Sequence, residues 1–312
     1  MPFDFATVSA PFRMQPGLRR IEPGTPQLTP NRLGARALRE KLAVLFHHAD
    51  QALLAAPDFD AQPALAALMR HAVAEHPAAF RWDGAARFES TALGWAINGE
   101  FVEGDSAVNP EIGACLRALP PPSRLAGLLS LAFAEDFAVI DGNTGRIPWL
   151  AVCLPSHWAP EDKVGRHFAE VHASVADNQL LVTASDHLAR LVTGSERWER
   201  FVWTITRHPR LHAHPKRCDE APWPAAASVG QLADAAFFRT EHQTFIPLPA
   251  PRQAIFTIHV QSRPLRDALA APAQARQVHD ALLTMSPAVL AYRGLGDARD
   301  RLLAWLADHA RE

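Results

Sequence analysis

Side chains that can do chemistry concentrate in one segment of the sequence, CLPSHWAPEDKVGRHFAEVHASVA, residues 153 to 176. The segment offers imidazoles that can bind a metal, a thiol that can act as a nucleophile and a lysine that can neutralise an anion. His167 and His172 are five residues apart, which puts them about 140° apart on a helix and on opposite faces of a strand. We therefore expect at most one of the two to be a metal ligand.

A second histidine-rich stretch, HPRLHAHP, occupies residues 208 to 215. On a strand, His212 and His214 would share one face, and a carboxylate such as Glu241 could complete a site for non-haem iron or zinc. The prolines that flank the stretch are equally typical of an exposed polar loop. A metal-dependent hydrolase therefore remains an alternative, and an exposed loop is the simpler interpretation.

The stretch RTEHQT, residues 239 to 244, has the alternation of a strand. It would send Arg239, Glu241 and Gln243 to one face, and Thr240, His242 and Thr244 to the other. On a surface strand this pattern is simply a solvated face. Around a cavity, Arg239 and Glu241 could hold each other's charge, and Glu241 could transfer a proton.

The cysteines and glycines exclude several classes of redox site. Cys115, Cys153 and Cys218 form no C-x-x-C pair, which argues against a disulfide framework, an iron–sulfur cluster and covalently attached haem. Cys153 could bind iron or act as a nucleophile, but no base stands near it in the sequence, and it is expected to be a small apolar residue. The segment YRGLGDARD lacks the third glycine of a dinucleotide loop. Electrons for any redox reaction would therefore come from another protein.

Composition indicates a globular protein without a polyanionic partner. Apolar residues make up 48% and charged residues 21% of the 312 residues, and the net charge is −2. This near balance gives no reason to expect binding to nucleic acid or to an anionic membrane. No apolar run is long enough to span a bilayer, and no secretory signal is apparent. We expect a cytoplasmic protein.

The pattern of elements predicts an α+β fold. Residues 1–30 are rich in proline and are expected to form an extended arm, and residues 31–312 are expected to form a single domain. Helices are predicted from Asn31, as the N-cap, and from residue 61, with Pro63 near its start. Further predicted helices lie near residues 121–135, 263–285 and 296–310.

The predicted strands come in neighbouring pairs. The runs FAVID and RIPWLAVCL are separated by the turn GNTG, and RFVWTIT, AFFRTEHQTFIPLP and RQAIFTIHVQS follow later in the chain. The residues of these runs favour strands, and the prolines and glycines between them favour turns. Strands that do not alternate regularly with helices indicate an antiparallel sheet.

Five segments together resemble a known family. They are PFRM-x-PGL at 11–18, AEDFAVID at 134–141, CLPSHWAPEDKVGRHFAEVHASV at 153–175, RTEHQTFIPLP at 239–249 and AIFTIHVQSRPL at 254–265. Their order is that of the haem-dependent oxidative N-demethylase family, and over about residues 11–295 the chain resembles its haem-binding α subunit. The chain departs from the family pattern at His242, where the family has arginine, and at Ser174, where it has proline.

This resemblance implies a fold and an activity. The fold would be a PAS-like antiparallel β-sheet with flanking helices, in which residues 31–312 carry a non-covalent haem b. The activity would be oxidative N-demethylation of a small alkylamine such as dimethylamine, using O2 and releasing formaldehyde. Electrons would come from separate reductase subunits with flavin, an iron–sulfur centre and NAD(P)H.

The resemblance also implies roles for individual residues. His172 would be the axial iron ligand, and Lys163 and Arg166 would bind the haem propionates. Glu241 would hold the cationic amine or relay a proton. The other residues expected at the cavity are Trp158, Phe168, Arg239 and Gln243. A haem sensor or carrier of the PAS type is the non-enzymatic alternative, because fold alone does not fix function.

Overall fold

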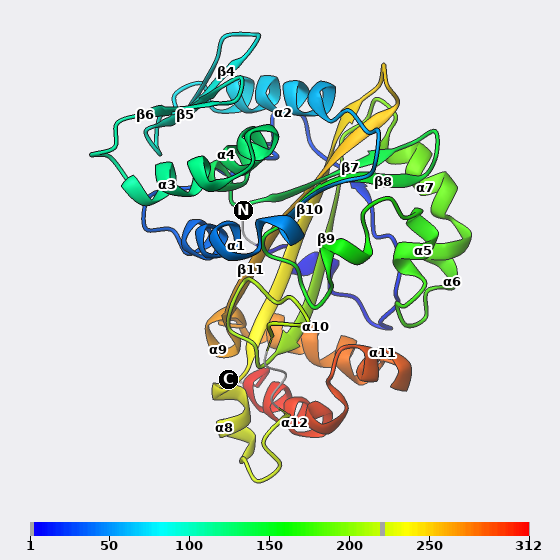
Figure 1. Ribbon diagram of the computed structural model, residues 1–312. Helices are drawn as coiled ribbons and strands as arrows, with labels where there is room; N and C mark the ends of the chain where they lie inside the picture. Colours follow the sequence, from blue (N-terminus) through cyan, green and yellow to red (C-terminus); the bar gives the residue numbers. More distant parts are fainter. Residues whose placement is uncertain (1–2, 219–221, 312) are drawn as a thin grey trace.

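The computed structural model describes residues 3–218 and 222–311, and its centre is a seven-stranded antiparallel sheet (Figure 1). The strand order is β1-β9-β10-β11-β7-β8-β2. These strands are β1 (Arg19–Arg20), β2 (Leu53–Ala55), β7 (Asp136–Asp141), β8 (Arg146–Ala151), β9 (Trp198–Thr206), β10 (Phe237–Leu248) and β11 (Gln253–Pro264). A four-stranded antiparallel sheet contains β3 (Phe80–Trp82), β4 (Arg87–Ser90), β5 (Trp95–Asn98) and β6 (Phe101–Gly104).

Helices surround the long strands in three groups (Figure 1). On one side lie α1 (Arg36–Ala52), α2 (Gln62–Glu75), α3 (Pro110–Ala118) and α4 (Arg124–Ala132). On the other lie the short helices α5 (Phe168–His172), α6 (Gln179–Thr183) and α7 (Ser185–Val192). At one end of the strands lie α8 (Val229–Asp234), α9 (Leu265–Ala268), α10 (Pro272–Leu283), α11 (Pro287–Tyr292) and α12 (Arg299–His309). The α+β class is confirmed, and the PAS-like arrangement stays a prediction.

The predicted strand pairs are present. β7 and β8 form an antiparallel hairpin around the turn at residues 142–145, as the GNTG signal indicates. β10 and β11 pair along their whole length, from Phe237 with Pro264 to Leu248 with Gln253. Aromatic and β-branched residues favour these strands, and the prolines at 249 and 251 stand in the turn between them, where no ladder hydrogen bond is lost.

Two of the helix predictions are wrong in detail. α1 begins at Arg36 with Ala35 as its N-cap, and Asn31 instead donates its side-chain amide to the carbonyls of Leu131 and Phe133, at 2.9 and 2.7 Å. The helix predicted over residues 263–285 is two helices, because Pro272 has no N–H to donate and starts a new helix at that position. The helix with Pro63 near its start is confirmed as α2.

The arm at residues 3–30 follows the edge of the sheet. Arg19 and Arg20 pair with β9, and Arg19 donates to Glu199 at 2.8 Å. Phe12 packs edge-on against Trp203, and Met14 reaches the cavity described below. In the part of the chain that the structure describes, no helix combines the length and apolarity needed to cross a bilayer.

A buried ion pair joins α1 to the start of β7. Lys41 Nζ lies 2.9 Å from Asp136 Oδ1, and the two side chains are 0% and 1% exposed. Lys41 also donates to the carbonyl of Glu135 at 2.5 Å, and Asp136 accepts from the backbone N–H of Leu154 at 2.6 Å. The pair therefore connects a helix, a strand and the segment that begins at Cys153.

We expect Lys41→Met to lower the free energy of unfolding by about 3–5 kcal/mol, because Asp136 would be left as an uncompensated buried charge. Urea denaturation of the two proteins measures the change. Arg311→Met, which breaks the exposed pair between Arg311 and Asp308, is the control and should cost about 1 kcal/mol or less. Equal effects of the two substitutions would contradict the importance of the buried pair.

Candidate functional site

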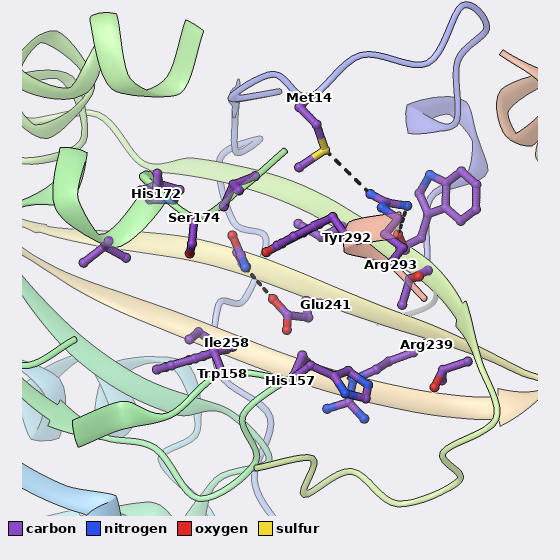
Figure 2. Close-up of a pocket in the computed structure, with 18 of the residues that line it drawn as sticks. Met14, His157, Trp158, His172, Ser174, Arg239, Glu241, Ile258, Tyr292 and Arg293 are labelled. Atoms are coloured by element: carbon purple, nitrogen blue, oxygen red, sulfur yellow. Dashed lines mark hydrogen bonds between the residues drawn. The ribbon is translucent and has the colours of Figure 1, made fainter. Parts of the chain in front are cut away.

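A large cavity lies against the face of the sheet that carries α5 (Figure 2). Its volume is about 690 Å³, within the range of about 300–1,000 Å³ that is typical of small-molecule and cofactor sites. Side chains of β9, β10 and β11 form its floor, and α5, the loop after Cys153 and the end of α11 form its walls. Its apolar lining includes Trp158, Phe168, Val171, Phe245, Phe256 and Ile258.

The polar alternation of β10 is present and is buried on both faces. Arg239, Glu241 and Gln243 all line the cavity, and Arg239 and Glu241 are 1% and 8% exposed. On the opposite face, His242 pairs with Glu199 at 2.7 Å. The departure from the family pattern at His242 therefore lies outside the cavity, whereas the departure at Ser174 is part of its lining.

Arg239 donates its hydrogen bonds to the surrounding loops and not to Glu241. Its Nε donates to Ser156 Oγ at 2.9 Å, and its remaining donors bind the backbone carbonyls of Pro155, Arg210 and Leu211 at 2.6–3.2 Å. Burial lowers the pKa of Arg239 to about 10, so the guanidinium remains charged at neutral pH. It braces two loops against the sheet, and its charge helps to balance that of Glu241.

Glu241 is a buried acidic group in the cavity. Gln243 Nε2 donates to Glu241 Oε2 at 2.5 Å, which fixes one carboxylate oxygen. Among the lining residues that the structure describes, the other acidic side chain is Asp297, which is exposed. Glu241 can therefore bind a cation or exchange a proton inside the cavity.

His172, on α5, presents one ring nitrogen that has no hydrogen-bond partner among the described residues. Its Nδ1 donates to the carbonyl of Phe168 at 2.8 Å, and no hydrogen bond to Nε2 is found among residues 3–218 and 222–311. Burial, with smaller contributions from the positive charges of Arg200 and Lys163, lowers the pKa of His172 to about 4 although the bond to Phe168 opposes the shift. The ring is therefore neutral at physiological pH. A neutral imidazole whose Nδ1–H is held by a carbonyl is the usual state of a metal-ligating histidine.

α5 is too short to be stable by itself, and its first turn is fixed from outside. His167 is its N-cap, accepting from Ala169 N at Nδ1, 3.2 Å, while its own N–H donates to Glu170 at 2.9 Å. His167 Nε2 lies 3.1 Å from Asp186 of α7. The N–H of Phe168 donates to the carbonyl of Gly145 in the β7–β8 turn at 2.8 Å. His167 and the hairpin turn thus determine where His172 points.

Three cationic residues near His172 differ in position. Lys163 lines the cavity, its Nζ donates to the carbonyl of Val171 at 3.0 Å, and burial lowers its pKa. Arg166 is exposed and is not part of the lining. Arg200, which the sequence reasoning missed, lines the cavity from β9, and its buried Nε has no hydrogen-bond partner in the described chain. Arg200 lies on the same face of β9 as Val202 and Thr204, because alternate residues of a strand point the same way. This alternation could have identified Arg200 as a cavity residue from the sequence.

His157 is a second histidine of the cavity that the sequence reasoning missed. It lines the cavity and has a positive φ of 60°, a conformation that non-glycine residues rarely adopt. Burial, followed by the charges of Arg239 and His208, lowers the pKa of His157 to about 4. The cavity therefore contains a neutral imidazole near Arg239, in addition to that of His172 on α5.

The structure does not assemble the alternative metal site of His212, His214 and Glu241. His212 Nδ1 donates to the carbonyl of Cys153 at 2.7 Å and Nε2 accepts from Arg217 at 3.2 Å, so both ring nitrogens are used. His214 pairs with Glu161 at 3.1 Å. Within the described residues, no three His, Cys, Asp or Glu side chains gather as metal ligands. Cys153 is 0% exposed, and burial raises its pKa.

Residues 35–303 match the family described as haem-dependent oxidative N-demethylase, alpha subunit-like. The chain belongs to this family. No curated protein matches the chain significantly.

The cavity of this N-demethylase-like chain fits the haem that the family name implies. His172 offers a neutral Nε2 as axial ligand, and the aromatic and aliphatic walls suit an apolar macrocycle. The buried Nε of Arg200 lacks a partner, a costly state that a carboxylate of the cofactor would relieve. Lys163 is a second cation in reach of the same cavity. Arg200 lines the cavity, whereas Arg166, the residue that the sequence suggested, does not.

We expect Gly145→Ala to loosen α5, because an added Cβ would lie 2.4 Å from His167 Nε2. Amide hydrogen exchange at residues 168–172 should become at least tenfold faster. Gly84→Ala is the matched control: Gly84 also has a positive φ, and its Cβ would meet nothing within 4 Å. The control shares the backbone strain of about 1–2 kcal/mol and should leave α5 unchanged. Unchanged exchange in Gly145→Ala would contradict the positioning of α5 by His167.

In haem-free protein, His172 should titrate near pH 4, because burial lowers its pKa from 6.5 to about 4. Below about pH 6.5 the unfolded chain binds a proton that the folded chain does not, so His172 lowers folded stability as pH falls from 6.5 toward 4. NMR titration of the ring nitrogens measures the midpoint, with His172→Gln to assign the signals. A midpoint near 6.5 would show that the ring is solvated.

Proposed function

We propose that this chain is a haem-dependent oxidative N-demethylase subunit that removes a methyl group from a small secondary or tertiary alkylamine, of which dimethylamine is the simplest case. The cofactor would be haem b, bound without covalent attachment. The observation that carries the proposal is one cavity that combines a neutral histidine with a free Nε2 and a buried carboxylate, His172 and Glu241. Family membership supports the haem and the reaction class.

The residues divide into a cofactor set and a substrate set. His172 would provide the axial ligand through Nε2, and Lys163 and Arg200 would neutralise the propionates. Trp158 and Phe168 would pack on the macrocycle. Glu241, held by Gln243, would bind the ammonium form of the amine and accept its proton, because oxidation of the adjacent methyl group is easier on the neutral amine.

The overall reaction balances with an external reductant. Bound haem would supply the iron at which O2 is activated. One oxygen atom converts an N-methyl group to N-hydroxymethyl, which breaks its C–N bond to release formaldehyde and the demethylated amine. The other oxygen leaves as water after uptake of two electrons and two protons. Glu241 can deliver a proton inside a cavity whose apolar walls limit bulk water.

The electrons would come from separate reductase subunits that carry flavin, an iron–sulfur centre and NAD(P)H. The family description as alpha subunit-like supports such partners. Cys115 and Cys153 are buried and outside any disulfide, which suits the reducing cytoplasm that we propose as the location.

We expect His172→Ala to lose haem or to shift its Soret band, and Glu241→Gln to keep haem while formaldehyde release falls by about 10²–10⁴-fold. The assay is formaldehyde formed per reductant consumed when haem-loaded protein receives O2, dimethylamine and a reductase. His47→Ala and Glu100→Gln, both exposed, are the matched controls.

An unchanged spectrum in His172→Ala would overturn the assignment of the ligand. A wild-type protein that binds haem but releases no formaldehyde from any methylamine would instead support a haem sensor or carrier. Loss of haem in Glu241→Gln would make Glu241 part of the cofactor site and not of the substrate site.

A further inference from the structure

Arg293 is a cation of the cavity that the proposed reaction leaves without a role. It follows the last residue of α11 and lines the cavity. Burial lowers its pKa to about 10, so it stays charged at neutral pH. Within residues 3–218 and 222–311, no carboxylate forms an ion pair with it. A charge that is desolvated in this way and has no counter-charge is costly.

The contacts of Arg293 hold its guanidinium in place without neutralising it. Nη1 donates to the carbonyl of Trp203 at 2.8 Å, and Nη2 approaches Met14 Sδ at 3.9 Å. The rings of Phe12 and Trp203 lie 4.6 and 5.4 Å from its central carbon. A guanidinium has five donors, and a thioether is a weak acceptor. Arg293 therefore connects the N-terminal arm to β9 and still has N–H groups available to bind an anion.

Arg293 lies close to Glu241 in the same cavity. Its partner Trp203 is next in sequence to Val202, and Val202 is directly opposite Glu241 in the β9–β10 ladder. With strands about 4.8 Å apart, the two charged groups are separated by on the order of 10 Å. The charges of Glu241 and Arg293 both act on the pKa of Tyr292. Figure 2 shows Glu241, Tyr292 and Arg293 around the same space. A small molecule can reach both groups at once.

We propose that the amine taken by this cavity carries a carboxylate, so that the substrate class is an N-methylated amino acid. Glu241 binds its ammonium group and Arg293 its carboxylate, with Tyr292 beside the chain that joins them. This inference rests on the proposed N-demethylation. Lys163 and Arg200, whose charges act on His172, remain for the cofactor's propionates, whereas a simple dialkylamine would leave Arg293 unpaired.

The test compares ligands that differ only in the carboxylate. Haem-loaded, full-length protein is titrated with N,N-dimethylglycine, its neutral amide and dimethylamine, and the dissociation constants are measured by calorimetry and from the Soret band. The wild type should bind dimethylglycine about 10- to 100-fold more tightly than the amide, as expected for charged hydrogen bonds. Arg293→Gln should remove this preference and leave the affinity for dimethylamine unchanged. Arg32→Gln, exposed and outside the cavity, should retain the preference.

Arg293→Lys keeps the charge but loses the planar fork and should retain only part of the preference, which provides a second variant if Arg293→Gln does not fold.

Equal affinity of the wild type for the acid and its amide would overturn the inference without using any variant. Loss of haem in Arg293→Gln, with the preference retained in the remaining holoprotein, would assign Arg293 to a propionate and also overturn it. If dimethylamine is demethylated but the carboxylate does not increase the affinity for the substrate, the N-demethylase function would stand and this inference alone would be wrong. No formaldehyde from any of the three amines would instead be a failure of the proposed function itself.

Discussion

The site depends on the antiparallel ladder that places β10 between β9 and β11. In such a ladder, successive side chains alternate between the two faces, and here both faces are buried. Arg239, Glu241 and Gln243 are thereby held on the cavity side by hydrogen bonds along two neighbouring strands. Because the register of β9 is fixed by the same ladder, Arg200 and Val202 face Gln243 and Glu241. A shift of one residue would turn every one of these side chains to the other face.

The opposite face of the same strands carries a second set of buried polar pairs. His242 binds Glu199 at 2.7 Å, and His259, directly across the ladder from His242, lies 3.1 Å from Glu135. Thr244 and Thr257 bond to each other at 2.8 Å, and Gln27 of the arm donates to Thr244 at 3.0 Å. These pairs connect the arm and the helical layer to the sheet. They place His242 in a polar pair on the face away from the cavity.

The helix that bears His172 shows how a local turn acquires a functional role. The GNTG turn between β7 and β8 is an ordinary hairpin signal, yet Gly145 is the residue against which His167 and Phe168 rest. Its positive φ and its close approach to an imidazole exclude a side chain at this position. The hairpin turn, the N-cap and α5 are therefore connected, because Gly145 restricts the position of His167 and His167 caps the helix that carries His172.

The sequence by itself determined the α+β class, the antiparallel pairing and the polar alternation of β10, because strand periodicity and turn residues are local properties. It also predicted that at most one of His167 and His172 is a metal ligand. It could not reveal that Arg200, His157 and Arg293 line the same cavity as Glu241. These residues are distant in sequence, and their position in one cavity depends on strand register and on loop packing. It named Arg166, which is exposed and does not line the cavity. It also suggested His212 and His214 as possible ligands, because spacing says nothing about the carbonyl, arginine and carboxylate partners that occupy their ring nitrogens. Tertiary structure alone decided which of the chemically able residues share one cavity, because burial and partner geometry are set by contacts across the whole chain.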